Sequence, residues 1–381
     1  MKNIKLRRMK FLLSVIVLLI LFSVKWNTHV HSLSVDRTLS LKLATTAEGS
    51  IKITGNTELS SHKDSGSGTK EDPYVIENRE ISYSATSTAD CGISITGTSE
   101  YFIIRNCIIT ELDLTVKGIG VYLNNVAPKT ATLLNNSIDM AGVGIWIFSS
   151  PAVNVSKNNI GSGNSGIIIG SSRSCVISEN LIAQSGNVGI SITTSDCVRI
   201  VKNTIDKFTT GIGTVFSQKL LIKQNQISGN EQGIELFNYT SNSLIICNQI
   251  EQNTNYGVYI GGAPCENNTV YMNNFIENNK DGTSQAYDEG INNKWDDTHL
   301  HYISIEGNYW HCDWSGDADY LIDGPAHSVD TVPLLAPVDI DKCMCECQEV
   351  VIIQSTPGLL GIFTLPILLF LTMKGKRRKQ Q

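Results

Sequence analysis

The stretch NNIGSGNSGIII at residues 158–169 is followed by NLIAQSGNVGISI at residues 180–192 and NTIDKFTTGIGTV at residues 203–215. Each stretch begins with Asn, has an apolar residue two positions later, and reaches a Gly-Ile pair eight or nine positions after the Asn. Apolar residues then alternate with other residues, which is the period of a β-strand. Short strands that recur every 22 or 23 residues predict a repeating coil.

Both landmarks recur along the middle of the chain. The Asn series is Asn106, Asn136, Asn158, Asn180, Asn203, Asn225, Asn248, Asn274 and Asn308. The Gly series is Gly92, Gly118, Gly144, Gly166, Gly189, Gly211, Gly233 and Gly257. Helical repeats and leucine-rich repeats do not fit this spacing or pattern. We therefore predict an all-β parallel β-helix, a solenoid of about ten coils of roughly 22 residues, stacked about 4.8 Å apart.

The recurring asparagines have a structural explanation. Asn tolerates left-handed backbone angles in turns, and its amide can bond the neighbouring backbone. Amides at one level of successive coils can also bond one another as a ladder. We expect this ladder at Asn136, Asn158, Asn180, Asn203, Asn225 and Asn248. Cys175 and Cys197 are 22 residues apart, so we expect them to stack on adjacent coils, either as a disulfide or as reduced thiols.

Composition and charge exclude several classes of protein. Hydrophobic residues make up 41% of the chain and charged residues 17%, which excludes a disordered protein. Ten of the 30 basic residues lie in the first ten and last eight positions, so the segment between has 20 basic and 36 acidic residues, a net charge of −16. An acidic segment repels phosphate backbones, so we expect no nucleic-acid partner.

The two ends predict membrane-directed segments. Residues 11–24 are apolar and follow five basic residues, as in a signal peptide, with an uncleaved signal anchor as the alternative. Residues 349–373 are long enough to span a bilayer, and basic residues follow them. We expect a membrane protein whose bulk is extracytoplasmic, at the cell surface; sequons at Asn135, Asn154, Asn238 and Asn267 agree with this placement. The predicted organisation is 1–34 signal peptide or anchor, 35–73 N-terminal cap, 74–310 β-helix, 311–348 C-terminal cap and Cys-rich linker, 349–373 transmembrane helix and 374–381 cytoplasmic tail.

Motifs on either side of the repeats resemble a known family. Residues 66–78 read GSGTKEDPYVIEN, and Asn292-Asn-Lys-Trp295-Asp296, Gly307-Asn-Tyr-Trp310 and Asp330-Thr-Val-Pro-Leu334 follow the last coils. This set resembles the NosD-like family of right-handed parallel β-helix proteins, which has the PbH1 or CASH-type repeat. The resemblance implies a right-handed coil over about residues 50 to 340 and, for one family role, accessory copper supply. Residues 356–373, with the basic tail, are similar to archaeal PGF-CTERM surface anchors.

Two groups of residues could bind metal. Asp317, Asp319 and Asp323, with Asp313 nearby, could supply oxygen ligands to Ca²⁺, with a solvated capping loop as the alternative. Cys343, Cys345 and Cys347 stand at alternate positions, and soft thiolates suit copper(I) or zinc. His299, His301, His311 and Cys312 could add ligands to them. The alternatives for these three cysteines are disulfide pairing or lipid attachment.

The tryptophans and acids bear on carbohydrate chemistry. Trp295, Trp310 and Trp314 could stack on sugar rings, or could cap the end of the β-helix. Asp139 and Asp206 occupy nearly equivalent positions three coils apart, and Asp196 and Glu235 lie on different levels, so no catalytic pair is predicted. The sequence has no G-x-S-x-G, H-E-x-x-H or phosphate-binding motif.

These features favour a membrane-anchored cell-surface scaffold or binding protein that contacts polysaccharides. The alternatives are a carbohydrate-active enzyme, such as a polysaccharide lyase or hydrolase, and a NosD-type copper accessory protein. We assign no catalytic residue, and we leave calcium and copper as the two candidate cofactors.

Overall fold

The computed structural model describes residues 47–113, 115–298, 306–311, 313–314, 316 and 318–343. The predicted signal segment at 1–34, transmembrane segment at 349–373 and cytoplasmic tail at 374–381 lie outside these residues. No helix in the part of the chain that is described is long and apolar enough to cross a membrane. The contacts divide the chain after Asp341, and the β-helix lies in the first unit.

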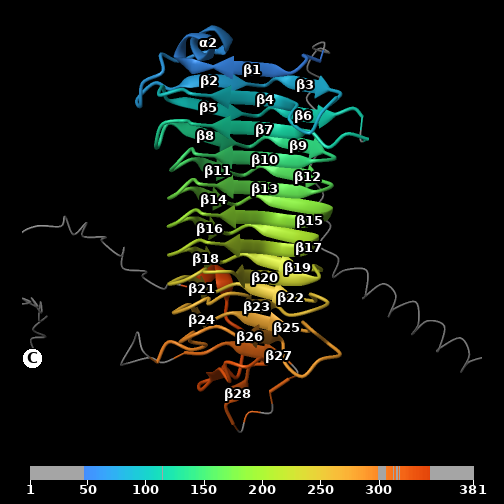
Figure 1. Ribbon diagram of the computed structural model, residues 1–381, viewed down its shortest axis with the longest axis vertical. Coiled ribbons are helices and arrows are strands. Elements are labelled where there is room, and N and C mark those ends of the chain that lie inside the picture. Colours follow the sequence, from blue (N-terminus) through green and yellow to red (C-terminus); the bar gives the residue numbers. More distant parts are fainter. Residues whose placement is uncertain are drawn as a thin grey trace, which may run out of the picture. The chain divides into compact units, whose positions relative to one another are not determined.

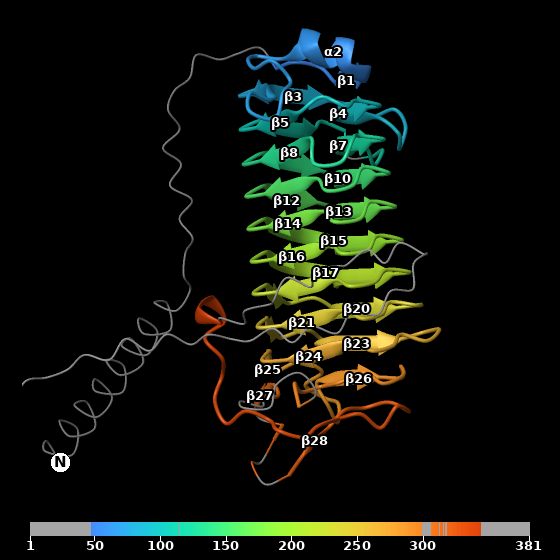
Figure 2. The ribbon, with the colours of Figure 1, turned by 90° about the vertical axis from the view of Figure 1, so that its left-hand side faces the viewer.

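The described strands between residues 51 and 311 form a parallel β-helix, as predicted (Figures 1 and 2). Nine strands make one sheet in the order of the chain. They are β2 (Tyr74–Glu77), β5 (Phe102–Arg105), β8 (Ala131–Leu134), β11 (Asn154–Ser156), β14 (Val176–Ser178), β16 (Arg199–Val201), β18 (Leu221–Lys223), β21 (Leu244–Ile246) and β24 (Thr269–Tyr271). Each pairs in parallel with the strand one coil away, for example Ile177 with Ile200.

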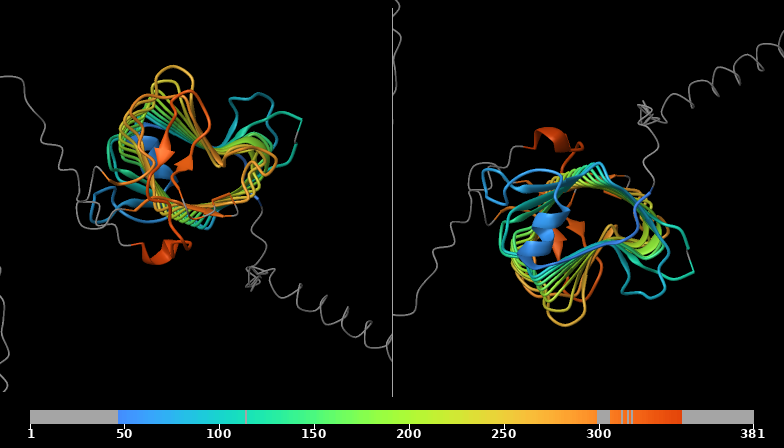
Figure 3. Two further views of the ribbon diagram at one scale, coloured as in Figure 1. Left: turned by 90° about the horizontal axis from the view of Figure 1, so that it is seen from below. Right: turned by 90° about the horizontal axis from the view of Figure 1, so that it is seen from above.

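The other eighteen strands of the coils form a second sheet, which bends into two columns. One column consists of the front strands, which face the viewer in Figure 1. They are β1 (Ile51–Thr54), β4 (Cys91–Thr96), β7 (Ile119–Asn124), β10 (Val143–Phe148), β13 (Ser165–Gly170), β20 (Gln232–Phe237), β23 (Val258–Gly261) and β26 (Ala286–Asp288). The side column is β3 (Glu80–Tyr83), β6 (Ile108–Glu111), β9 (Ser137–Met140), β12 (Asn159–Ser162), β19 (Gln226–Ser228), β22 (Gln249–Glu251), β25 (Asn274–Ile276) and β27 (Tyr309–His311). The long strands β15 (Leu181–Thr193) and β17 (Thr204–Val215) run through both columns. Seen along the axis, the coils superimpose and their outline is indented on one side (Figure 3).

A few elements lie outside the two large sheets. They are α2 (Gly55–His62), the antiparallel pair β28 (Tyr320–Leu321) and β29 (Val329–Asp330), and a 3-10 helix at Ile340–Lys342. Strand β1 already pairs with β4, so the coils begin before residue 74, where the sequence predicted their start. Residues assigned to the N-terminal cap therefore supply the first strand.

The interior is filled by stacked aliphatic side chains, because alternate residues of each strand point inward. One interior column contains Ile53, Ile95, Leu123, Ile147, Ile169, Ile192, Thr214, Leu236 and Ile260, all fully buried. Removal of this apolar surface from water is the main stabilising contribution to such a repeat.

The six asparagines of the predicted ladder are buried and stack in register. Each Nδ2 donates to the Oδ1 of the ladder asparagine in the next coil at 2.9–3.0 Å, and Asn248 extends the series to Asn273 and Asn308. The left-handed residue is not the ladder asparagine but the residue before it, for example Glu179 with a φ of 56°. The amide thus satisfies buried backbone groups while its neighbour makes the turn.

The structure corrects the register at four sequence landmarks. Cys107 and Asn273, rather than Asn106 and Asn274, occupy the ladder level. Gly120, rather than Gly118, lies in the glycine column, directly under the carbonyl of Gly144. Cys175 is level with Val198 rather than with Cys197, since Val176 pairs with Arg199. The expectation that the two cysteines stack is therefore wrong, and both are free thiols.

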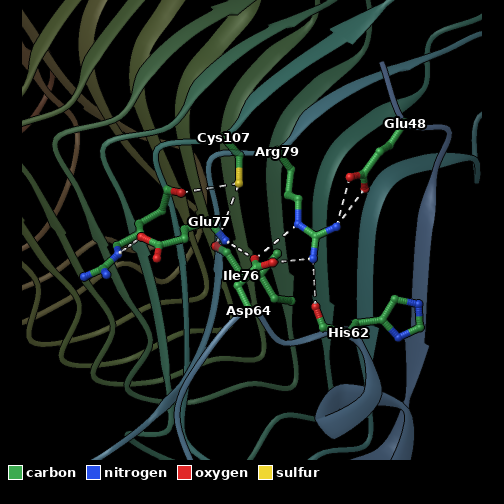
Figure 4. Close-up of polar contacts among 8 residues, drawn as sticks. Glu48, His62, Asp64, Ile76, Glu77, Arg79 and Cys107 are labelled. Carbon is green, nitrogen blue, oxygen red and sulfur yellow. Dashed lines mark hydrogen bonds and ion pairs between the residues drawn. The ribbon is translucent and has the colours of Figure 1, made fainter. Parts of the chain in front are cut away.

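Arg79 forms hydrogen bonds with residues on two sides at the N-terminal end of the stack (Figure 4), and we call this group the Arg79 clamp. Its guanidinium donates to both carboxylate oxygens of Glu48 at 2.9 and 3.1 Å and to Asp64 at 2.7 and 3.2 Å. It also donates to the carbonyl of His62, the last residue of α2, at 3.3 Å. The hydrogen bond to Asp64 is the largest contribution that raises the pKa of Arg79. Arg79 thus joins Glu48, Asp64 and α2 to the first coil.

Candidate functional site

The outward residues of the front strands form one continuous column along the axis. Parallel pairing fixes its order as Lys52, Ser94, Tyr122, Trp146, Ile168, Ser191, Gly213, Glu235, Tyr259 and Tyr287. We call it the front column. Because side chains alternate across a strand, these residues point away from the buried isoleucines on either side. Aromatic residues gather near both ends of this column.

A tyrosine patch, composed of Tyr256, Tyr259 and Tyr287, lies at one end of the front column. The rings of Tyr259 and Tyr287 are stacked, with centroids 4.9 Å apart and planes 6° from parallel. The ring of Tyr256 lies 5.3 Å from that of Tyr287 and 6.2 Å from that of Tyr259. All three side chains are partly exposed. The ring of Tyr259 lies over Gly261, where a side chain would meet it.

Carboxylates surround the tyrosine patch. The hydroxyl of Tyr256 donates to Asp323 at 3.3 Å, and that of Tyr287 donates to Glu289 at 3.2 Å. The hydroxyl of Thr283 lies 2.9 Å from each carboxylate oxygen of Asp323 and donates its hydrogen bond to that carboxylate. Burial, followed by the charge of Glu289, raises the pKa of Tyr259. The tyrosines therefore remain neutral phenols at physiological pH, with flat ring surfaces beside hydrogen-bond acceptors.

Glu235 lies one coil from Tyr259 in the front column. Burial raises the pKa of its carboxyl group, and a weak hydrogen bond of 3.4 Å from Thr210 lowers it in part. The carboxylate is thus placed between the tyrosine patch and the smaller side chains of the middle coils. A raised pKa is a property of many acids in binding and catalytic sites.

The second aromatic group is the pair Tyr122 and Trp146. Their ring centroids lie 5.6 Å apart with an interplanar angle of 63°, an edge-to-face contact. Both side chains are partly exposed. Rings of this kind, with an apolar face and a polar edge, suit ligands that are themselves partly apolar and partly hydroxylated.

Two of the three tryptophans that were predicted to contact a ligand are buried. Trp295 and Trp310 are 1% and 2% exposed, and Trp310 stacks between Phe275 and Tyr320 with centroids 4.2 and 3.9 Å away. The ligand-contact prediction is wrong for both, because their faces are covered by the core at the end of the stack. Trp314 is half-buried and packs against the same core. The end-capping alternative fits these positions.

Those predicted calcium residues that the structure describes do not converge. Asp319 is exposed, whereas Asp323 is engaged by Tyr256 and Thr283 at the tyrosine patch. Asp313 accepts from the hydroxyl of Tyr320 at 3.3 Å. Asp317 lies outside the described residues. Within the ranges that the structure covers, no three His, Cys, Asp or Glu side chains come together as metal ligands.

The predicted copper or zinc residues are described only in part. Cys343 is disulfide-bonded, so its sulfur is not the free thiolate that the prediction required. Cys345, Cys347, Cys312, His299 and His301 lie outside the described residues. The ring nitrogen of His311 is 3.0 Å from the hydroxyl of Tyr309.

The acids considered for catalysis are far apart along the coils. Asp139 and Asp206 do share one column, through Gly161 and Ala183. Three coil steps of about 4.8 Å separate them by about 14 Å, beyond the spacing of a glycosidase pair. Asp196 accepts from the backbone of Gln218 in a turn.

The aromatic residues of the front column were not predicted from the sequence. Trp146 and Tyr122 occupy equivalent positions in adjacent repeats, as do Tyr259 and Tyr287. An alignment of the coils on Gly120, Gly144 and Gly257 places Tyr122, Trp146 and Tyr259 two residues after these glycines. Tyr256 and Asp323 had no such signal, because a turn and the C-terminal cap bring them to the patch.

Comparison with known families agrees with this architecture. The family model described as "Periplasmic copper-binding protein (NosD)" matches residues 105–316, more than half of the chain. The chain belongs to the NosD family. A second family model, "Right handed beta helix region", matches residues 42–160 of this NosD-family chain.

Solved structures with a similar fold are distant from this NosD-family chain. The Dettilon tailspike protein is 13% identical with a TM-score of 0.45, over 75% of this chain and 60% of the tailspike chain. Pectate lyase Pel9A is 10% identical with a TM-score of 0.41, over 77% of this chain and 80% of its own. The A-module of mannuronan C-5 epimerase AlgE4 from Azotobacter vinelandii is 14% identical with a TM-score of 0.36, over 56% and 60%. No curated protein sequence matches the chain.

Proposed function

We propose that this chain is a cell-surface β-helix protein that binds polysaccharide through the tyrosine patch. The observation that carries the proposal is the cluster of partly exposed Tyr256, Tyr259 and Tyr287 rings on one outward face, with Asp323 and Glu289 at their hydroxyls. Ring faces can stack on the apolar faces of sugars, and the adjacent carboxylates can accept hydrogen bonds from sugar hydroxyls.

The proposed location follows from the two ends of the sequence. Basic residues precede the apolar segment at 11–24 and follow the one at 349–373, an arrangement that suits an extracytoplasmic body with a membrane anchor. The disulfide bonding of Cys247 and Cys343 also suits an oxidising compartment.

The test is polysaccharide binding by the purified full-length chain in detergent. Titration calorimetry against neutral and acidic polysaccharides should show binding, and Tyr259→Ala should weaken it about tenfold or more, as for an aromatic contact at the centre of a site. Tyr239→Ala is the matched control, since Tyr239 is 51% exposed but lies in a turn outside the front column. Absence of binding, or equal loss in both variants, would overturn the proposal.

The same samples separate the two alternative functions. New reducing ends that depend on Glu235 would make the protein a carbohydrate-active enzyme; Glu235 is the described acid whose raised pKa and position beside Tyr259 favour this alternative. Uptake of copper(I) without polysaccharide binding would favour the role in the family description.

A further inference from the structure

We propose that the bound polysaccharide is a neutral chain that runs along the axis of the β-helix, from the tyrosine patch to Tyr122 and Trp146. This inference rests on the proposed function and specifies how the ligand lies and what charge it carries. Its basis is that both aromatic groups belong to one column of outward residues, rather than to separate faces.

The register gives the separation between the two aromatic groups. From Trp146 the column passes through Ile168, Ser191, Gly213 and Glu235 to Tyr259, which is five coil steps. At about 4.8 Å per step, the two aromatic groups lie about 24 Å apart. A ligand that contacts both must therefore be a chain of several sugar units.

Two of the four residues between the aromatic groups have small side chains or none. Ser191 and Gly213 follow one another at the middle of the column, and both are partly exposed. A side chain at Gly213 would meet nothing closer than 3.4 Å, so that position is open on its outer side rather than filled by a neighbour. Small residues at such positions allow close approach of a ligand to the backbone.

The charges favour a neutral polysaccharide. Glu235, Glu289 and Asp323 all lie at the tyrosine end, where Glu289 and Asp323 accept from tyrosine hydroxyls. A carboxylated or sulfated chain would bring like charges close to these groups, which costs free energy at short distance. Hydroxyl groups of a neutral chain can instead donate to them.

The experiment measures affinity as a function of ligand length. Size-fractionated neutral oligosaccharides of glucose, mannose and galactose are titrated against the full-length chain, with extended lengths below and above about 24 Å. We expect affinity to rise steeply, by about tenfold or more, once one chain can contact both aromatic groups. A carboxylated oligosaccharide of equal length should bind more weakly than its neutral counterpart, with a difference that shrinks at high salt.

Variants separate this inference from the proposed function. Trp146→Ala should weaken binding of long chains about tenfold and leave short chains unaffected, whereas Tyr259→Ala should weaken both. Ser191→Arg should place a long side chain across the path of the ligand and reduce only the long-chain affinity. Because Ser191 is partly exposed, this variant is a second test if Trp146→Ala folds poorly. Binding that depends on Tyr259 but not on length, Trp146 or Ser191 would overturn the axial arrangement and leave the proposed function intact. Loss of all binding to every sugar would overturn both.

Discussion

The indole nitrogen of Trp310 donates a hydrogen bond of 2.9 Å to Oδ2 of Asp330, and both residues are buried at the C-terminal end of the coils. The same oxygen accepts from the backbone nitrogen of Asn308, the last member of the asparagine ladder, at 2.7 Å. Asp330 therefore takes the place of the next ladder asparagine and accepts the hydrogen bond from Asn308. A similar bond of 3.0 Å joins Trp295 to buried Asp288, so two tryptophan–aspartate pairs close this end.

Asp330 predicts a specific dependence of stability on pH. Burial raises its pKa from 3.8 to about 6, although several hydrogen bonds to the carboxylate oppose the shift. The folded state thus holds the proton more tightly than the unfolded chain, and its stabilising contribution is lost as pH rises from about 4 to above 6. The contribution is about 3 kcal/mol on this shift.

The comparison with Asp330→Asn measures that contribution. The variant cannot titrate at this position. Because the unfolded carboxyl group is already partly ionised at pH 4, the unfolding free energy of the wild type should fall by about 2.5 kcal/mol more than that of the variant between pH 4 and pH 8. At pH 7 the variant should still be less stable. Oδ2 of Asp330 accepts from Asn308 and Trp310 and Oδ1 accepts from Val332, so replacing one oxygen by an amide nitrogen leaves one of these sets of donors without its acceptor. A free-energy difference that stays constant across this pH range would contradict the prediction.

The asparagine ladder predicts a large difference between buried and exposed amides. Asn180→Ala removes acceptors for the backbone and side chain of Asn158 and a donor to Val155 and Asn203. Since these groups are buried, we expect a loss of at least about 3 kcal/mol in unfolding free energy. Asn187→Ala is the control, because Asn187 makes a similar 2.9 Å amide bond to Asn164 in an exposed position. Denaturant unfolding of both variants checks the prediction, and comparable losses would refute it.

The ladder also shows how far the sequence determines the fold. The period and the six central asparagines follow from the sequence because one residue repeats with one spacing. The predicted ladder position is wrong by one residue at two places: Cys107 takes the position predicted for Asn106, and Asn273 takes the position predicted for Asn274. The burial of the following residues decides the register, since Ile108 is 50% exposed whereas Ile109 is fully buried. Composition does not carry that information, because both are isoleucine.

The residues of the candidate site could not be predicted from the sequence, for a different physical reason. Trp295 and Trp310 were predicted as ligand contacts because they lie close together in the sequence. Hydrogen bonds from their indoles to buried aspartates instead hold them in the interior. Tyr259 and Asp323 are distant in sequence, and the parallel stacking and the C-terminal cap bring them together around Tyr256. The folded chain, rather than a pattern in the sequence, brings Tyr256 and Asp323 to the patch.

The Arg79 clamp predicts a salt-dependent stability of the N-terminal end. Arg79→Lys keeps the charge but loses the planar geometry that serves Glu48 and Asp64 together. Because these ion pairs are partly exposed, we expect a modest loss of about 1 kcal/mol at low salt and less in 1 M salt.

Limited proteolysis reports the local effect of this change. Cleavage near α2 should be faster in Arg79→Lys than in the wild type. Arg105→Lys is the control, since the guanidinium of Arg105 makes one ion pair of 2.8 Å with Glu77, and it should change the cleavage rate less. Equal rates for all three proteins would show that the clamp does not hold this end.

The glycine column predicts which glycines tolerate a methyl group. A Cβ atom at Gly189 would lie 2.5 Å from Cγ2 of Ile205 and 2.6 Å from the carbonyl oxygen of Gly211, so the backbone of two coils would have to move. We expect Gly189→Ala to cost about 2 to 3 kcal/mol, as in other overpacked cores. Gly213→Ala is the same substitution outside the glycine column, two residues after Gly211. The atom nearest to a Cβ at Gly213 would be 3.4 Å away. That variant should be neutral or slightly stabilising, because alanine restricts the unfolded chain. The melting temperatures of the two variants test the prediction directly: a stable Gly189→Ala protein would mean that the coils are not packed as closely at this column as the register requires.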